Sequence, residues 1–416
     1  MLFRSLATAL CLELSRNASD ALRDHATKIL PLAFVGRFDE DEKRRRRWEE
    51  VWEENASGAS STCRLYLDEI LASSLKRLGS SQYQVKRQGA AALAGLAVAA
   101  PDVVAGAGKV PAILDALLKE LPGRVWEGKE SLLPGVADVV EKCPEASGTF
   151  GGETVVAALV AEASRKKSSY REAALSALQR SLTALAPPGG TKETSPVCDF
   201  FPVAFPLIRD VLSPGGGSDA DGVSGDASAA ARKDQSPAND ADGGVGGNTI
   251  REMEEEAHRK ASEAKAGGAV AERALECLAS LCAGAGDATS LAAAAPAVAS
   301  FAGEAIDPSA PWTRRAAGLR VVKSLSTRCG QLNVAGIEAW LDPLRESMGS
   351  CAGDPKVSQL RSVAAEALGA STRALGSVGN CSTRDAFVKK LEEMRDGDRA
   401  PDVRGAAHRS LADALS

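Results

Sequence analysis

A short residue pattern recurs along this chain and constrains its fold more than any other feature. The pattern is a bulky residue, a basic residue, a pair of small residues and then Leu, as in residues 170–175. Copies, two of them looser, start at residues 85, 126, 170, 312, 360 and 403, in steps of 41, 44, 142, 48 and 43 residues. Steps of about 40–47 residues are typical of HEAT and armadillo arrays, in which each unit is a pair of helices. The sequence therefore predicts an all-α fold, an α-solenoid of HEAT/armadillo-type helix pairs.

The copy at residues 82–96 shows why such a helix needs neighbours. Its apolar or small residues follow the 3.6-residue period of a buried helical face, at Val85, Gly89, Ala92, Leu93 and Leu96. One helix cannot bury this stripe alone. Because glycine has no side chain, we expect a close helix–helix contact at Gly89. The basic residues Lys86 and Arg87 are expected on the solvent side.

The same period divides the chain into about eight helix pairs. The first pair is expected at residues 2–15 and 19–34, and the chain is expected to begin inside an array. Residues 1–213 form the first part of the array, with a charged insertion at 37–61, and residues 250–416 continue it. Residues 214–249 are rich in Gly, Asp, Ser and Ala, which offer almost nothing to bury, and they predict a disordered loop. The helix at 197–212 therefore meets its partner late, at 252–282.

The charged insertion contains the candidate partner-binding residues. A basic run lies between acidic residues, and two tryptophans four residues apart share one helical face: Arg44, Arg45, Arg46, Arg47, Trp48 and Trp52. One interpretation is a solvated helix whose tryptophans anchor it to the array. The other is a docking or nuclear-import patch, since Trp and Arg are enriched among interface hot spots.

Composition excludes several classes of function. The net charge of −5 argues against a general nucleic-acid binder, which needs a basic surface to displace counterions. No apolar run reaches the length of a membrane span. The nine cysteines include no Cys-x-x-Cys pair, and most are expected to be buried, reduced thiols of a cytosolic or nuclear protein.

No catalytic, cofactor or metal site is predicted. Residues 123–129 match the Gly-x-x-x-x-Gly-Lys pattern of a phosphate-binding loop, but Glu130 replaces the Ser or Thr that holds magnesium, and a helix precedes the loop where a strand is required. A tight turn between repeat helices is the preferred interpretation. His25, His258 and His408 have no Cys or carboxylate at ligand spacing. The sequence indicates a protein that is not an enzyme.

Five segments resemble a known family in the same order along the chain. They are residues 31–36, 48–55, 64–70, 87–90 and 123–133. The chain resembles the C-terminal part of the HEAT-repeat proteasome adaptor and scaffold protein family, most tightly over residues 29–135. The resemblance implies a non-enzymatic scaffold that binds the 26S proteasome and links or monitors its core and regulatory particles, in the cytoplasm and nucleus. Its partners would be proteasome subunits and other proteins. The alternative is an importin-like or vesicle-coat-like transport adaptor, which shares the solenoid.

Overall fold

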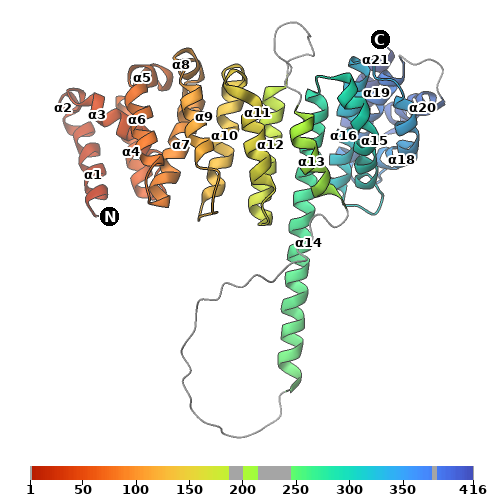
Figure 1. The fold of residues 1–416 in the computed structure, drawn as a ribbon, viewed down its shortest axis with the longest axis horizontal. Helices are drawn as coiled ribbons and strands as arrows, with labels where there is room; N and C mark the ends of the chain where they lie inside the picture. Colours follow the sequence, from red (N-terminus) through yellow and green to blue (C-terminus); the bar gives the residue numbers. More distant parts are fainter. Residues whose placement is uncertain (1, 187–199, 214–244, 377–381, 416) are drawn as a thin grey trace.

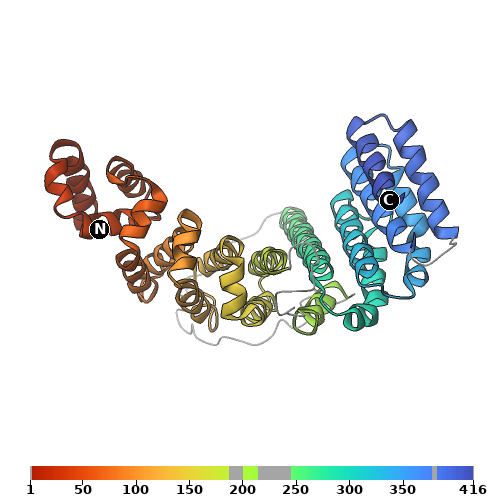
Figure 2. The same ribbon diagram turned by 90° about the horizontal axis from the view of Figure 1, so that it is seen from above.

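The computed structural model describes residues 2–186, 200–213, 245–376 and 382–415. These residues form α-helices and short 3₁₀ turns, and the described part of the chain contains no strand. The helices stack side by side in two rows along an arc (Figures 1 and 2). In Figure 2, α14 and α16 lie on the inner side of the arc and α13 and α15 on its outer side. The predicted α-solenoid of HEAT-type helix pairs is confirmed.

The helices fall into two sets, which we name the inner and outer rows. The inner row consists of α1 (Leu2–Asn17), α4 (Glu42–Asn55), α7 (Tyr83–Ala99), α10 (Leu132–Lys142), α12 (Ser168–Leu185), α14 (Val245–Gly284), α16 (Trp312–Gln331), α19 (Ser358–Gly376) and α21 (Pro401–Leu415). The outer row consists of α2 (Ser19–Arg23), α3 (Ala26–Gly36), α5 (Ala59–Leu65), α6 (Leu67–Leu78), α8 (Pro101–Gly106), α9 (Val110–Lys119), α11 (Pro144–Ala163), α13 (Phe201–Leu212), α15 (Ala288–Ala305), α17 (Ile337–Leu341), α18 (Arg345–Ala352) and α20 (Ser382–Gly397). The 3₁₀ turns η1 (Lys129–Ser131) and η3 (Asp342–Leu344) precede α10 and α18.

The first helix pair differs from the expected one. The sequence pairs residues 2–15 with 19–34 and sets 37–61 apart as an insertion. In the structure α3 packs against α4, and α4 also packs against α1, so α4 is the inner helix of a regular pair. The error has a physical cause. The helix is so rich in Glu and Arg that its buried stripe reduces to Val51, Trp52 and the partly buried Trp48, which is too narrow to register as a period.

The contact expected at Gly89 is confirmed. A Cβ atom added to Gly89 would lie 2.4 Å from the backbone nitrogen of Leu78 and 2.7 Å from the carbonyl oxygen of Ser74, both on α6. Backbone atoms cannot move aside as a flexible side chain can. Glycine is therefore what allows α7 to pack directly on α6.

The basic residues of the pattern are not in solvent as expected. Lys86 forms an ion pair with Glu120, at 2.5 Å, and Arg87 forms one with Glu40, also at 2.5 Å. Both acceptors lie in turns of neighbouring pairs, Glu120 after α9 and Glu40 before α4. The expectation was wrong because a long basic side chain can lie along an apolar surface and still place its charge at the next turn.

Basic residues also join neighbouring helix pairs near the C-terminal end. Arg361 of α19 donates two hydrogen bonds to the Asp398 carboxylate, at 2.7 and 2.9 Å, and a third to the carbonyl oxygen of Asp354, at 2.9 Å. Arg315 of α16 donates to the Asp354 carboxylate at 3.0 Å. Asp354 precedes α19 and Asp398 precedes α21. Each arginine therefore holds the turn of the following pair.

Helix α14 is the delayed partner of α13, as the sequence predicts. Val270, Leu275, Leu278 and Leu281 are all buried and restore the apolar stripe. The helix is 40 residues long, and Figure 1 shows its N-terminal part extending beyond both rows. Most of the predicted loop at 214–249 lies outside the described residues. Residues 245–249, however, begin α14 and are not part of a loop.

Two further properties follow from the described residues. None of the helices in the described part of the chain combines the length and hydropathy that a membrane span requires. The seven described cysteines are free thiols, and all but Cys11 are buried. Burial raises the pKa of Cys63 to about 11 and that of Cys329 to about 12, so both remain protonated at neutral pH.

Candidate functional site

Helix α4 carries all six residues that the sequence singled out. The Asp41 carboxylate accepts a hydrogen bond from the backbone N–H of Arg44, at 2.9 Å, and so caps the N-terminus of the helix. The Arg44 side chain donates two hydrogen bonds to the Asp39 carboxylate, at 3.0 and 2.7 Å. This pairing raises the pKa of Arg44. Arg44 is therefore committed to closing the turn that leads into α4.

The rest of the basic run is spread around the helix. Arg45 and Arg47 are half-buried, whereas the Arg46 side chain is 72% exposed and forms an ion pair with Glu42 one turn earlier. Four consecutive residues of a helix point in four directions, since each step turns about 100°. The structure therefore does not gather the run into one patch, and Arg46 is its exposed member.

The two tryptophans pack inward. Trp52 is 4% exposed, and its ring meets that of Phe34 edge to face at a centroid distance of 5.2 Å. The Arg37 guanidinium lies over the Trp52 ring at 5.6 Å. Trp48 lies against Gly36, where an added Cβ would come within 2.1 Å of its ring. Of the two interpretations left open by the sequence, this geometry favours the anchor, because Trp52 has almost no surface to offer a partner.

In the segment that resembles a phosphate-binding loop, the lysine side chain is buried inside the turn. Gly123 and Gly128 have φ values of 83° and 86°, which place both in the left-handed region that glycine adopts readily. The Lys129 side chain is 0% exposed, 3.7 Å from Glu162 and 3.4 Å from the carbonyl oxygens of Pro122 and Gly123. Burial lowers the pKa of Lys129. Its amine thus faces protein atoms on the inside of the turn and does not reach toward a ligand.

Glu162 is the centre of this buried group, and no sequence pattern singled it out. Arg165 donates two hydrogen bonds to the Glu162 carboxylate, at 2.6 and 2.7 Å, and the Tyr170 hydroxyl donates a third at 2.6 Å. Burial and the neighbouring carboxylate raise the pKa of Tyr170. Because buried charges are stable only when paired, these contacts hold the turn at 121–131 against the start of α12.

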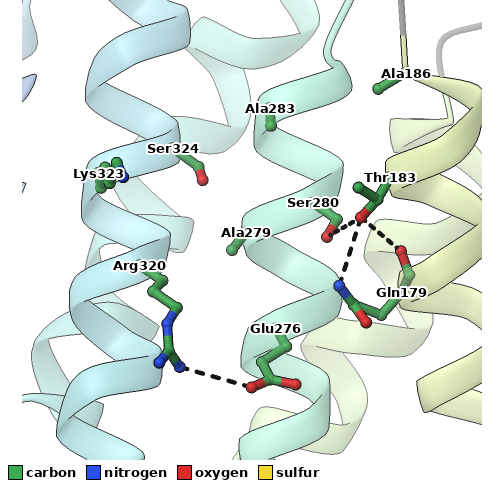
Figure 3. Close-up of a pocket in the computed structure, with 10 residues that line it drawn as sticks. All are labelled: Gln179, Thr183, Ala186, Glu276, Ala279, Ser280, Ala283, Arg320, Lys323 and Ser324. Atoms are coloured by element: carbon green, nitrogen blue, oxygen red, sulfur yellow. Dashed lines mark hydrogen bonds and ion pairs between the residues drawn. The ribbon is translucent and has the colours of Figure 1, made fainter. Parts of the chain in front are cut away.

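A groove on the inner row was not singled out by the sequence. It runs along α14 between α12 and α16 and encloses about 450 Å³ (Figure 3). Its floor is made by Ala279, Ser280 and Ala283 of α14, whose short side chains leave room between the neighbouring helices. The signal that could have located it is this run of small residues on the side of α14 that faces away from α13.

The walls of the groove are polar. On the α12 side, the Thr183 hydroxyl lies 3.0 Å from that of Ser280, and Gln179 lies beside it. On the α16 side, Arg320 lies 3.7 Å from Glu276, and Lys323 lies at the edge. Figure 3 shows the Thr183 and Ser280 hydroxyls side by side and the Arg320 side chain directed toward Glu276, whereas Lys323 pairs with Glu366 of α19 at 2.8 Å. The groove offers hydrogen-bonding groups and charges at the surface of the inner row.

The described residues hold no group of three or more His, Cys, Asp and Glu side chains that could bind a metal ion.

No family model matches the chain. It is 34% identical over 210 residues to the human protein called proteasome adapter and scaffold protein ECM29, a match that covers 47% of this chain and 11% of the relative. The chain is thus similar to a part of this human protein. The ECM29 proteasome component of Saccharomyces cerevisiae is 26% identical over 147 residues, which cover 35% of this chain and 8% of the relative.

Solved structures support the fold. The Kap95 chain in a complex of Kap95 with Nup1 superposes with a TM-score of 0.55 at 12% sequence identity, over 92% of this chain and 45% of the Kap95 chain. An identity this low shows the solenoid fold and nothing about partners. The matches to ECM29 proteins, in contrast, rest on sequence. The chain spans about a tenth of the length of those relatives, so their function as whole proteins is a proposal for this chain.

Proposed function

We propose that this chain is a non-enzymatic scaffold that binds the 26S proteasome and links or monitors its core and regulatory particles. The observation that carries this proposal is the 34% identity over 210 residues to human ECM29, whose name describes a proteasome adapter and scaffold. The fold is compatible, since stacked helix pairs present a long continuous surface on which a large assembly can rest. We place this function in the cytoplasm and nucleus, with proteasome subunits and other proteins as partners.

Binding to purified particles tests the proposal directly. The purified chain is immobilised and exposed to 26S proteasome, to core particle and to regulatory particle in separate reactions. We expect retention of the 26S proteasome and of at least one isolated particle, well above retention on an unrelated helical solenoid of similar net charge. Retention no greater than on that control would contradict the proposal. Binding of a GTP-loaded transport GTPase with no proteasome retention would favour the importin-like alternative.

The absence of enzymatic activity is part of the proposal and has its own test. The Gly-x-x-x-x-Gly-Lys segment is the feature most open to a nucleotide interpretation, and there the lysine amine is turned into the protein toward Glu162. We therefore expect a fluorescent ATP analogue with magnesium to show no saturable binding to the purified chain. Saturable binding that disappears in a Lys129→Met variant would overturn this part of the proposal.

A further inference from the structure

The N-terminal part of α14 projects from the solenoid. The helix begins at Val245, and Figure 1 shows this part extending beyond both rows. Among the side chains of α14 that the structure describes, Glu256, Ser262 and Lys265 are exposed, and burial begins at Val270. Most of the stability of a helix in a protein comes from packing one of its faces against another element. A partner helix would provide that packing for the projecting part.

One side of the projecting part carries an apolar stripe. Its members are separated by 3, 4, 4 and 3 residues, a mean of 3.5: Ile250, Met253, Ala257, Ala261 and Ala264. This mean is the spacing of a coiled-coil seam, the narrow apolar face that pairs one helix with another. The order of the intervals is the same when it is read from either end. A second copy of the helix lying antiparallel would therefore present the same stripe, centred on Ala257.

The sizes of the stripe residues favour the antiparallel orientation. With the centre at Ala257, Met253 of one copy lies opposite Ala261 of the other, and Ile250 lies opposite Ala264. Each of these levels combines a large and a small residue, which is how facing positions fill the space between two helices. A parallel pair would place large residues opposite large ones and alanines opposite alanines, so the space between the helices would be filled unevenly.

The charges of the same segment favour the same orientation. An acidic run with four glutamates, residues 252–256, precedes Ala257, and a basic run, residues 258–260, follows it. An antiparallel copy brings the acidic run of each helix against the basic run of the other, whereas a parallel copy opposes like charges. Ion pairs one turn apart within a single helix are weak, so they leave both runs able to interact with a second helix.

We propose that the projecting part of α14 pairs with that of a second copy of this chain, antiparallel and with a two-fold axis at Ala257. Such an interface closes on itself, because both copies contribute the same surface. The contact lies away from the two rows, so pairing leaves the surface of the array open (Figure 1). The inference goes beyond the proposed scaffold function. Pairing can fail while proteasome binding holds, and hold while proteasome binding fails.

Sedimentation equilibrium of the intact chain over a range of concentrations tests the proposal. We expect a mass that rises toward twice the 43.0 kDa of one chain. The acidic-run variant carries Glu254→Lys, Glu255→Lys and Glu256→Lys, and the basic-run variant carries Arg259→Glu and Lys260→Glu. Each alone should remain a monomer where the unaltered chain is a dimer, because like charges then meet across the axis. An equimolar mixture of the two should restore the dimer, since their runs are again opposite in charge.

Matched controls separate pairing from a general effect of charge. Lys166→Glu, Lys167→Glu makes the same change of charge as the basic-run variant, at two exposed lysines between α11 and α12, and should dimerise normally. Ala257→Glu places two carboxylates at the axis and should abolish the dimer. Ser262→Glu should retain it, because the exposed Ser262 lies about 140° around the helix from Ala257.

Four results would overturn the proposal. The first is an unaltered chain that is monomeric at every concentration, and the second is a dimer that persists in either run variant alone. The third is a mixture of the run variants that stays monomeric, which would also show that their loss of pairing came from a damaged helix. The fourth is an equal loss of the dimer from the control substitutions in the turn between α11 and α12.

Discussion

Neighbouring helix pairs are held together by different contacts at the two ends of the array. Near the C-terminal end, one device is used twice: Arg315 of α16 holds Asp354, and Arg361 of α19 holds Asp398, each in the turn of the following pair. Near the N-terminal end, the pair of α3 and α4 meets the pair of α6 and α7 through contacts that occur once. There the Phe38 ring lies in a notch at Gly95, where an added Cβ would come within 2.1 Å of it.

Two polar contacts complete the N-terminal junction. The Gln88 side chain donates to the carbonyl oxygen of Val35 at 3.2 Å, and Arg87 forms its ion pair with Glu40. Arg87 is a basic residue of the repeated pattern, but it contacts the turn of the preceding pair, whereas Arg315 and Arg361 contact the turn of the following one. The comparison shows that neighbouring helix pairs of this solenoid are kept in register either by a repeated Arg–Asp contact or by local packing. The two ends should therefore respond differently to substitution.

The largest effect is expected at the N-terminal end, from Trp52→Ala. Trp52 is buried against Phe34, and loss of a buried aromatic side chain costs about 3–5 kcal/mol. Because repeats contact only their neighbours, hydrogen exchange should rise mainly in α1, α3 and α4 and leave α19 and α21 protected. Trp312→Ala is the control, since Trp312 is 42% exposed, and it should change stability little. An equal loss from the two variants would mean that Trp52 is not the anchor.

Gly89→Leu should follow in size. A side chain at this position meets the backbone of α6, so overpacking is expected to cost about 1–3 kcal/mol, near the upper end of that range. Gly349 of α18 provides the contrast, because nothing lies within 4 Å of a Cβ added there. Gly349→Ala should stabilise α18 by up to about 1 kcal/mol, since alanine is the better helix former. Denaturant unfolding measures both, and an unchanged midpoint for Gly89→Leu would contradict the packing.

At the C-terminal end, Arg361→Gln tests the repeated Arg–Asp contact. It removes the two hydrogen bonds to the Asp398 carboxylate, and hydrogen bonds to charged groups contribute about 1.5–3 kcal/mol. The Arg361 guanidinium lowers the pKa of Asp398 below its ordinary value. The stabilisation is therefore present above that ordinary value and is lost as pH falls through the lowered pKa.

The chain with Arg361 and the Arg361→Gln variant should accordingly differ most at neutral pH and converge in acid. Unfolding midpoints measured from pH 7 downward check this. Hydrogen exchange should localise the change to α19, α20 and α21, at the opposite end from that of Trp52→Ala. A difference that stays constant or grows as pH falls would show that the Arg361 contact with Asp398 is not its source.

The sequence predicted the regular parts of the molecule and missed the parts held by single contacts. The pattern of small residues around Gly89 is visible in sequence because a helical stripe repeats locally. The segment of α4 was expected to be an inserted helix, and its place as the inner helix of a regular pair was missed, because Trp52 packs on Phe34 of another helix and spacing along the chain does not reveal such a contact. The same holds for Lys129, whose partner Glu162 lies on α11. The groove was missed because its lining residues come from α12, α14 and α16.

The smallest effect on stability is expected from Arg46→Glu, which also tests whether α4 does more than pack. Arg46 is exposed, and its pair with Glu42 lies on the surface, where such pairs contribute about 0–1 kcal/mol. The unfolding midpoint should therefore hardly move. If the basic run of α4 contacts an acidic surface of the proteasome, the variant should bind the particle more weakly and with less dependence on salt.

Arg23→Glu is the matched control for this experiment. Arg23 of α2 is similarly exposed and pairs with Asp20 on its own helix, so the substitution makes the same change of charge on a different helix. A loss of binding specific to Arg46→Glu would place α4 at the contact, because long-range charge alone would act on both variants. Equal loss from both would indicate a general electrostatic effect. Unchanged binding in both would leave α4 as a helix whose tryptophans pack and whose arginines close turns.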